Sequence, residues 1–167
     1  MLKIKKGESL TVMYIWQDYI PEDMEYVEKW LDKEAIRLTG LDDGWRGFFD
    51  YWKNDAVCTL GENFWCKVVF EGKNPFAVIA FGLWEGSVHI MEVLVAPKFR
   101  KQGRGTGLLK ELLENGERIF DCSVEKAEAV IFPDNPASQK AFEKVGFVFD
   151  HAHEDGDAWY YIFQKNR

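Results

Sequence analysis

The sequence predicts an α/β fold of the α+β type, with a mixed, mostly antiparallel central sheet of about six to seven strands flanked by helices. Two observations support this prediction. Segments rich in β-branched and aromatic residues alternate with segments whose apolar residues recur at helical spacing. Three of the strand-like segments also follow one another with only short turns between them, which is typical of antiparallel hairpins.

The first strand is predicted over residues 10–16, which are rich in β-forming side chains. A helix should follow from Pro21, which fits the first helical turn, and end near Gly40. Its apolar residues lie at helical spacing: Met24, Val27, Leu31 and Ala35. A second, short helix is expected over residues 45–53.

Three antiparallel strands are predicted next. The segments 64–70 and 76–84 are joined by the turn sequence E-G-K-N-P at 71–75, a strong hairpin signal. A second turn at Glu85-Gly86 leads into a strand over 88–95.

The rest of the chain alternates helices and strands. A glycine-rich loop precedes a helix with four leucines on its buried side: Leu108, Leu109, Leu112 and Leu113. A strand is expected over 127–132, followed by a turn at 133–136, a short helix and a final hairpin of 147–149 with 159–163. Because a helix connects the strands at 88–95 and 127–132, we expect them to be parallel neighbours joined by a right-handed crossover.

Length and composition fit one globular domain covering residues 1–167. Hydrophobic residues make up 47% of the 167 residues and charged residues 29%, which excludes a disordered protein. The net charge of −7 argues against nucleic-acid binding, because such a surface repels phosphate backbones. The three cysteines form no C-x-x-C pair, so we expect reduced thiols, no metal and a cytoplasmic location. The hydrophobic run at 10–16 is too short to span a membrane, and no membrane partner is expected.

The glycine-rich loop carries the strongest functional signal. Residues 98–110 contain five basic residues and no acid. They lead into a helix, whose first N–H groups lack partners and attract anions, and glycines let that backbone approach a ligand closely. The spacing of Gly103, Gly105 and Gly107 fits neither a P-loop nor a dinucleotide fingerprint. We infer a phosphate site, and the alternative is a solvated basic turn.

Two motifs resemble those of one family. The run R-x-x-G-x-G at 100–105, preceded by V-x-P at 95–97, is similar to the acetyl-CoA signature of the GNAT superfamily of N-acetyltransferases. The runs N-P-A-S at 135–138 and F-E-K-V-G-F at 142–147 resemble the closing motif of the same family. The order of predicted strands and helices also matches over most of the chain. The resemblance implies an enzyme that uses acetyl-CoA, and a possible homodimer.

The resemblance also implies which residues bind acetyl-CoA. The pantetheine arm would pair with the strand before the loop, and the diphosphate would rest on the loop amides. The resulting set is Val93, Leu94, Val95, Arg100, Lys101, Gln102, Gly103, Arg104, Gly105, Thr106, Asn135, Ser138 and Phe142. Within this set, Ser138 would serve as a cofactor contact or a helix cap.

Catalysis would be direct attack of an amine on the thioester in a ternary complex. Glu92 is the candidate base, because it lies in an apolar run where a carboxylate is costly without a partner or a task. The alternative for Glu92 is the solvated face of the strand. Phe142 stands where the family usually has a tyrosine that acts as the acid, so that role stays open. Other candidate acids are Tyr160, Tyr161, His151 and His153.

Charge suggests the acceptor. Residues 18–55 hold eleven acids and five basic residues, a net charge of −6. Together with a tryptophan-rich rim and acids in the last turn, this segment favours a cationic amine such as a polyamine, an aminoglycoside-like compound or a lysine side chain. The proposed rim residues are Trp30, Trp45 and Trp52, and the acids are Asp150, Glu154, Asp155 and Asp157. Ordinary solubility charge remains an alternative. A catalytically silent acyl-CoA-binding sensor or protein-interaction module is the alternative to an enzyme.

Overall fold

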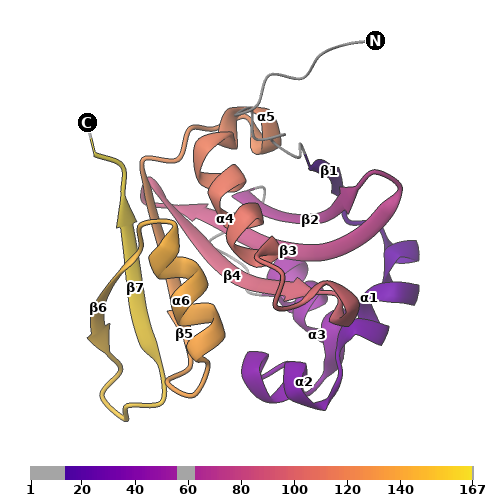
Figure 1. The fold of residues 1–167 in the computed structure, drawn as a ribbon, viewed down its shortest axis with the longest axis horizontal. Coiled ribbons are helices and arrows are strands. Elements are labelled where there is room, and N and C mark those ends of the chain that lie inside the picture. The colour runs from indigo at the N-terminus through magenta and orange to yellow at the C-terminus, as the bar shows by residue number, and fades with distance from the viewer. Residues whose placement is uncertain (1–13, 56–62, 167) are drawn as a thin grey trace, which may run out of the picture.

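A computed structural model describes residues 14–55 and 63–166 and contains a seven-stranded sheet (Figure 1). The strand order is β1-β2-β3-β4-β5-β7-β6. The strands are β1 (Ile15–Asp18), β2 (Phe64–Glu71), β3 (Asn74–Trp84), β4 (Ser87–Val95), β5 (Lys126–Ile131), β6 (Val148–Ala152) and β7 (Trp159–Gln164). Neighbouring strands are antiparallel except β4 and β5, which are parallel. The predicted mixed sheet and the predicted parallel pair are both confirmed.

The helices lie mostly where the sequence predicts them. They are α1 (Met24–Trp30), α2 (Lys33–Thr39), α3 (Gly44–Asp50), α4 (Arg104–Glu114), α5 (Gly116–Phe120) and α6 (Pro136–Lys144). Short 3-10 turns occupy Pro21–Asp23 and Pro97–Phe99, and a π-helical turn follows α3 at Tyr51–Asp55. The short α5 was not predicted. No helix in the described part of the chain is both long and apolar enough to cross a membrane.

The N-terminal region differs from the prediction in two places. The helix expected from Pro21 to Gly40 is two helices, because Asp32 starts α2 by accepting a hydrogen bond from Ala35 N at 2.8 Å. Gly40 ends α2 in the left-handed conformation, as predicted (φ 71°). Within the predicted strand 10–16, residues 10–13 lie outside the described residues, and β1 runs from Ile15 to Asp18.

Helices cover both faces of the sheet. One cluster of buried apolar residues joins the sheet to α4, α5 and α6, and includes the four predicted leucines of α4. A second cluster joins the opposite face to α1, α2 and α3. Figure 1 shows α4 and α6 on the face toward the viewer. Consecutive residues 76–81 of β3 are fully buried because the strand is covered on both sides.

The sheet opens between β4 and β5. The two strands pair only from Val88 to Ile90 on β4, opposite Ala127 to Ala129 on β5. β4 nevertheless continues to Val95 along its other neighbour, β3. The two halves of the sheet therefore share a short seam, and the strands separate toward their carboxyl ends. This separation positions the candidate site.

Candidate functional site

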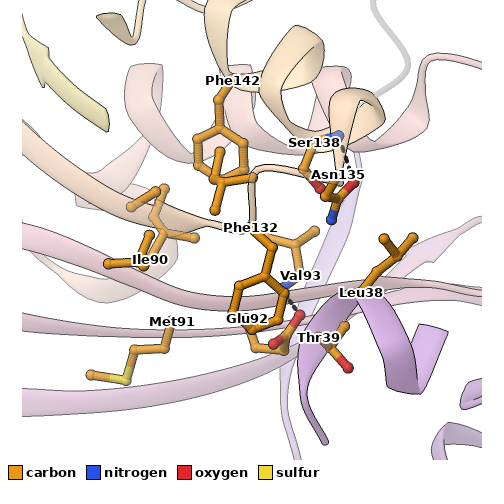
Figure 2. Close-up of a pocket in the computed structure, with 13 residues that line it drawn as sticks. Leu38, Thr39, Ile90, Met91, Glu92, Val93, Phe132, Asn135, Ser138 and Phe142 are labelled. Carbon is orange, nitrogen blue, oxygen red and sulfur yellow. Dashed lines mark hydrogen bonds between the residues drawn. The ribbon is translucent and has the colours of Figure 1, made fainter. Parts of the chain in front are cut away.

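A pocket of about 240 Å³ lies where β4 and β5 separate (Figure 2). Residues of α2, β4, β5, the loop after β5, and α6 line it. They are Leu38, Thr39, Ile90, Met91, Glu92, Val93, Ala129, Val130, Ile131, Phe132, Asn135, Ser138 and Phe142. The predicted base Glu92 and four predicted cofactor contacts, Val93, Asn135, Ser138 and Phe142, therefore share one cavity.

A β-bulge aims Glu92 into this pocket. The register with β3 shifts between Ala80, which lies opposite Glu92, and the next residue, so that Met91 is an extra residue on β4. Ile90 and Val93 pack on the α4–α6 side of the sheet. Met91 packs on the opposite side, where the partner of Glu92 also lies. The bulge thus places Met91 and Glu92 on the same face, toward α1–α3.

The surroundings of Glu92 favour a protonated carboxyl. Burial among apolar residues raises the pKa of Glu92 to about 8, although a hydrogen bond from Val93 N to Oε1 at 3.1 Å acts in the opposite direction. A carboxylic acid with this pKa becomes a competent base in mildly alkaline solution. Glu92 is half-buried on β4, and its side chain lines the pocket.

Helix α6 forms the wall on the other face. Asn135 is buried and caps the helix, with its Oδ1 accepting from Ser138 N at 3.1 Å. Figure 2 shows the nitrogen of the Asn135 carboxamide turned into the pocket, toward Val93. Ser138 and Phe142 are four residues apart and therefore lie on one face of α6. The Phe142 ring packs edge-on against Phe147.

The glycine loop presents free backbone amides beside the end of β4. Gly103 is left-handed (φ 76°) and starts α4, and the first helical hydrogen bond runs from Gly107 N to Gly103 O at 2.9 Å. The amides of residues 104–106 consequently have no acceptor within the helix. A Cβ added to Gly105 would lie 3.9 Å from Val95, so the loop backbone stays close to the strand end. This arrangement suits an anionic group.

The two arginine side chains of the loop already have protein partners. The Arg100 guanidinium bonds to the end of α1 and to Asp32. The Arg104 guanidinium bonds to Glu71 on β2 at 2.6 Å and covers the ring of Phe99. The Nε of Arg104 is buried and has no hydrogen-bond partner among the described residues. Most nitrogens of these two guanidinium groups are therefore engaged within the protein, whereas the amides at the start of α4 have no acceptor within the helix.

The other candidate acids lie elsewhere. His151 stacks on Tyr160 in the β6–β7 hairpin and pairs with Asp150 at 2.6 Å. His153 lies in the same hairpin, 3.2 Å from Asp157. Tyr161 is buried in the core. None of these four candidates lines the pocket.

The tryptophan-rich rim predicted from the sequence is wrong. Trp30 and Trp45 are core residues, 8% and 0% exposed. Trp52 is partly exposed but does not line the pocket. Several nearby acids serve the fold instead: Glu28, for example, accepts from Arg46 N at the start of α3. The predicted rim failed because aromatic residues at helical spacing turned inward, as core residues do.

Sequence reasoning missed the pocket residues on the α1–α3 side. They are Leu38, Thr39, Met91 and Phe132. Met91 could be recognised only by locating the bulge, and a bulge has no signature in a continuous apolar run. Leu38 and Thr39 reach the pocket only because of how α2 packs on the sheet, and local sequence does not show that packing.

Solved structures with the same fold support this architecture. An acetyltransferase from Thermus thermophilus aligns with a TM-score of 0.72 at 15% identity, over 92% of this chain and 99% of that one. The aminoglycoside acetyltransferase AAC(6')-Ib in complex with coenzyme A gives 0.71 at 18% identity, over 92% and 95%. Spermidine N-acetyltransferase from Vibrio cholerae, in complex with CoA and spermine, gives 0.67 at 14% identity, over 90% and 95%.

Comparison of the sequence with family models shows the family of this protein. No curated protein matches the chain significantly. The model of the acetyltransferase (GNAT) family matches residues 16–147, which include most of β1, the glycine loop and α6. This match spans most of the chain and agrees with both sequence motifs, so the protein belongs to the acetyltransferase (GNAT) family.

Proposed function

We propose that the protein transfers the acetyl group of acetyl-CoA to a primary amine. One observation carries the proposal: Glu92 lines the pocket at the point where β4 and β5 separate. A thioester inserted there would lie between Glu92 on one face and Asn135, Ser138 and Phe142 on the other.

The cofactor side fits coenzyme A. Beyond Ile90, the edge of β4 that faces β5 pairs with no strand in the described part of the chain, so Val93–Val95 can bond to the amides of a pantetheine arm. The unpaired amides of the glycine loop would hold the diphosphate. Structural neighbours contain bound coenzyme A, which supports this choice of cosubstrate.

Glu92 would supply the proton acceptor. An alkylammonium has a pKa of about 10.4, so it must lose a proton before its nitrogen can attack. The Glu92 carboxylate takes this proton directly or through a water molecule. The nitrogen then bonds to the carbonyl carbon, a backbone N–H of β4 stabilises the oxyanion, and the C–S bond breaks. After attack the nitrogen carries one further surplus proton, which it loses to water as the amide forms. The departing thiolate takes up a proton from water, because Phe142 has none to donate.

The amine that accepts the acetyl group is proposed to be a cation. The net charge of −6 over residues 18–55 would attract a cation to this side of the sheet. Two structural neighbours have an aminoglycoside or spermine in their complexes. Polyamines and aminoglycosides are therefore the first acceptors to test, with monoamines of similar length as controls.

Two measurements test the proposal. Calorimetric titration of acetyl-CoA should show saturable binding, and release of free thiol should depend on the amine. Equal rates with monoamines and polycations would refute the cationic acceptor while keeping acetyl transfer. Absence of acetyl-CoA binding by folded protein would refute the whole proposal.

An acyl-CoA-binding sensor is the second candidate function, and Phe142 favours it. This residue lines the pocket and has no proton to donate to a thiolate. Tight acetyl-CoA binding, with no thiol release over a broad amine panel, would select the sensor.

A further inference from the structure

We propose that Arg100 links the glycine loop to the α2 wall of the acceptor pocket, so that its guanidinium sets the amine KM rather than the affinity for acetyl-CoA. The inference rests on the proposed function and adds a positioning residue to it. It also gives Arg100 a different task from the cofactor contact that the sequence motif implied.

The Arg100 guanidinium joins three segments. Its Nε donates to Val95 O at the end of β4 at 2.9 Å, and Nη2 donates to Trp30 O at the end of α1 at 2.7 Å. Its Nη1 donates to Asp32 Oδ2 at 2.6 Å. The side chain is 26% exposed, so water screens these contacts only partly. One residue of the glycine loop therefore holds the carboxyl end of α1 and the start of α2.

Asp32 connects Arg100 to the start of α2. One carboxylate oxygen caps the helix at Ala35 N, and the other receives Arg100. The hydrogen bond from Ala35 N, and to a smaller extent the contact with Arg100, hold the pKa of Asp32 below its usual value. The carboxylate therefore stays charged near neutral pH, and it joins the cap and the ion pair in a single group.

Helix α2 carries part of the acceptor wall. It has only seven residues, a length at which tertiary contacts rather than helical propensity hold a helix in place. Its last residues, Leu38 and Thr39, line the pocket on the same face as Glu92. Loosening the start of α2 should therefore move the wall that positions the amine, while leaving the loop amides free to bind diphosphate.

The same contacts argue against a direct role for this guanidinium at the diphosphate. Every nitrogen of the group already donates to a protein oxygen. The Asp32 carboxylate beside it would also repel a phosphate. Arg100 would have to leave three partners in order to bind the cofactor.

The test compares Arg100→Gln, Asp32→Asn and the double variant. Asp32→Asn keeps a side-chain oxygen for the cap and removes the charge that Arg100 binds. We expect each single variant to raise the amine KM about fivefold or more, with the acetyl-CoA Kd changed less than about twofold. The double variant should be no worse than the worse single variant, because both remove the same link. Arg100→Lys should restore part of the loss.

Lys101→Gln is the matched control, since it removes one positive charge from the same loop. It should weaken acetyl-CoA binding at low salt and leave the amine KM as it is. If Arg100→Gln shows that same pattern, Arg100 is a cofactor ligand and the inference is wrong. Additive effects of the two substitutions would also refute the link.

Hydrogen exchange of α2 separates this inference from the proposed function. Amides of α2 should exchange faster in Arg100→Gln and in Asp32→Asn than in the wild type, whether or not any amine is acetylated. If the wild type turns over no amine, the proposed function fails and exchange still decides the link. Unchanged exchange in both variants overturns the inference. If Arg100→Gln does not fold, Asp32→Asn and Arg100→Lys provide the same comparison.

Discussion

At the scale of single residues, we expect Glu92 to make activity depend on pH. Its pKa of about 8 means that the carboxylate becomes abundant only above that pH. We expect the amine kcat/KM to rise as pH increases through about 8, and Glu92→Gln to lower it about 100-fold or more. Initial rates of thiol release across this range provide the measurement. A flat profile in the wild type, or an unchanged rate in the variant, would remove Glu92 as the base.

The same carboxyl should make the folded protein more stable at low pH than at high pH, whereas activity should increase with pH. Its pKa in the folded protein is raised from 4.5 to about 8, so the protonated form stabilises the fold below pH 4.5 and that contribution is lost as pH rises through 8. Glu92→Gln cannot ionise. We expect its Tm to equal that of the wild type in acid and to exceed it by several degrees above pH 8, since ~1 kcal/mol corresponds to about 2–4 °C here. Equal Tm values in alkaline buffer would contradict this.

Sequence motifs allowed candidate site residues to be chosen, but they did not show which partners the side chains bind. Local chemistry in the sequence singled out Glu92 and the glycine loop as candidates, and the family resemblance singled out Asn135. The sequence did not reveal that Arg100 binds Asp32, because these residues are 68 positions apart. It could not pair Arg104 with Glu71, 33 positions away, for the same reason. Counting charges in a segment cannot show which of them are neutralised by partners in the fold.

At the scale of elements, α6 depends on Asn135 for its first turn. Asn135→Ala should lower the free energy of unfolding by about 1 kcal/mol, because Ser138 N loses its acceptor. Asn135→Asp keeps an acceptor for the cap but replaces the carboxamide nitrogen that faces the pocket with a negative charge. We expect normal stability and weaker acetyl-CoA binding for the aspartate variant. Chemical denaturation and calorimetry measure the two effects separately.

The two Asn135 variants together distinguish a structural role from a binding role. If Asn135→Asp is as unstable as Asn135→Ala, the cap is not the source of the stability. If Asn135→Asp binds acetyl-CoA like the wild type, the carboxamide nitrogen does not face the ligand.

Strands were easier to predict than helix boundaries. The hairpins of β2, β3 and β4 have turn sequences that admit few conformations, and the structure follows them closely. The break between α1 and α2 has neither glycine nor proline. It arises where Asp32 caps a new helix and binds Arg100. The cap is a local signal, because it joins residues three positions apart, whereas the contact with Arg100 is tertiary.

At the scale of the whole molecule, the site exists because two halves of a sheet meet along a short seam. The crossover from β4 through α4 to β5 follows from the order of elements and was predictable. The separation of β4 from β5 was not, because it depends on where pairing stops and on the bulge at Met91. The outline of the fold follows from sequence patterns, whereas the cavity follows from a local departure from regular pairing.

An ion pair crosses the opening between these halves. Arg37 on α2 binds Asp134 in the loop before α6, and both side chains are more than half exposed. The neighbours of each residue line the pocket: Leu38 beside Arg37, and Asn135 beside Asp134. An exposed pair contributes less than about 1 kcal/mol to stability, so its charges should matter more for the approach of the acceptor.

Removing each partner should therefore change the amine KM in opposite directions. Arg37→Ala leaves Asp134 unpaired at the opening and should lower the KM of a cationic amine, while Asp134→Ala leaves Arg37 unpaired and should raise it. Both effects should shrink in high salt. Arg118→Ala removes a positive charge remote from the pocket, where Arg118 pairs with Glu111, and should leave the KM unchanged. Steady-state kinetics at two salt concentrations measure this, and a KM shift of the same sign in both opening variants would show that the pair acts through structure rather than charge.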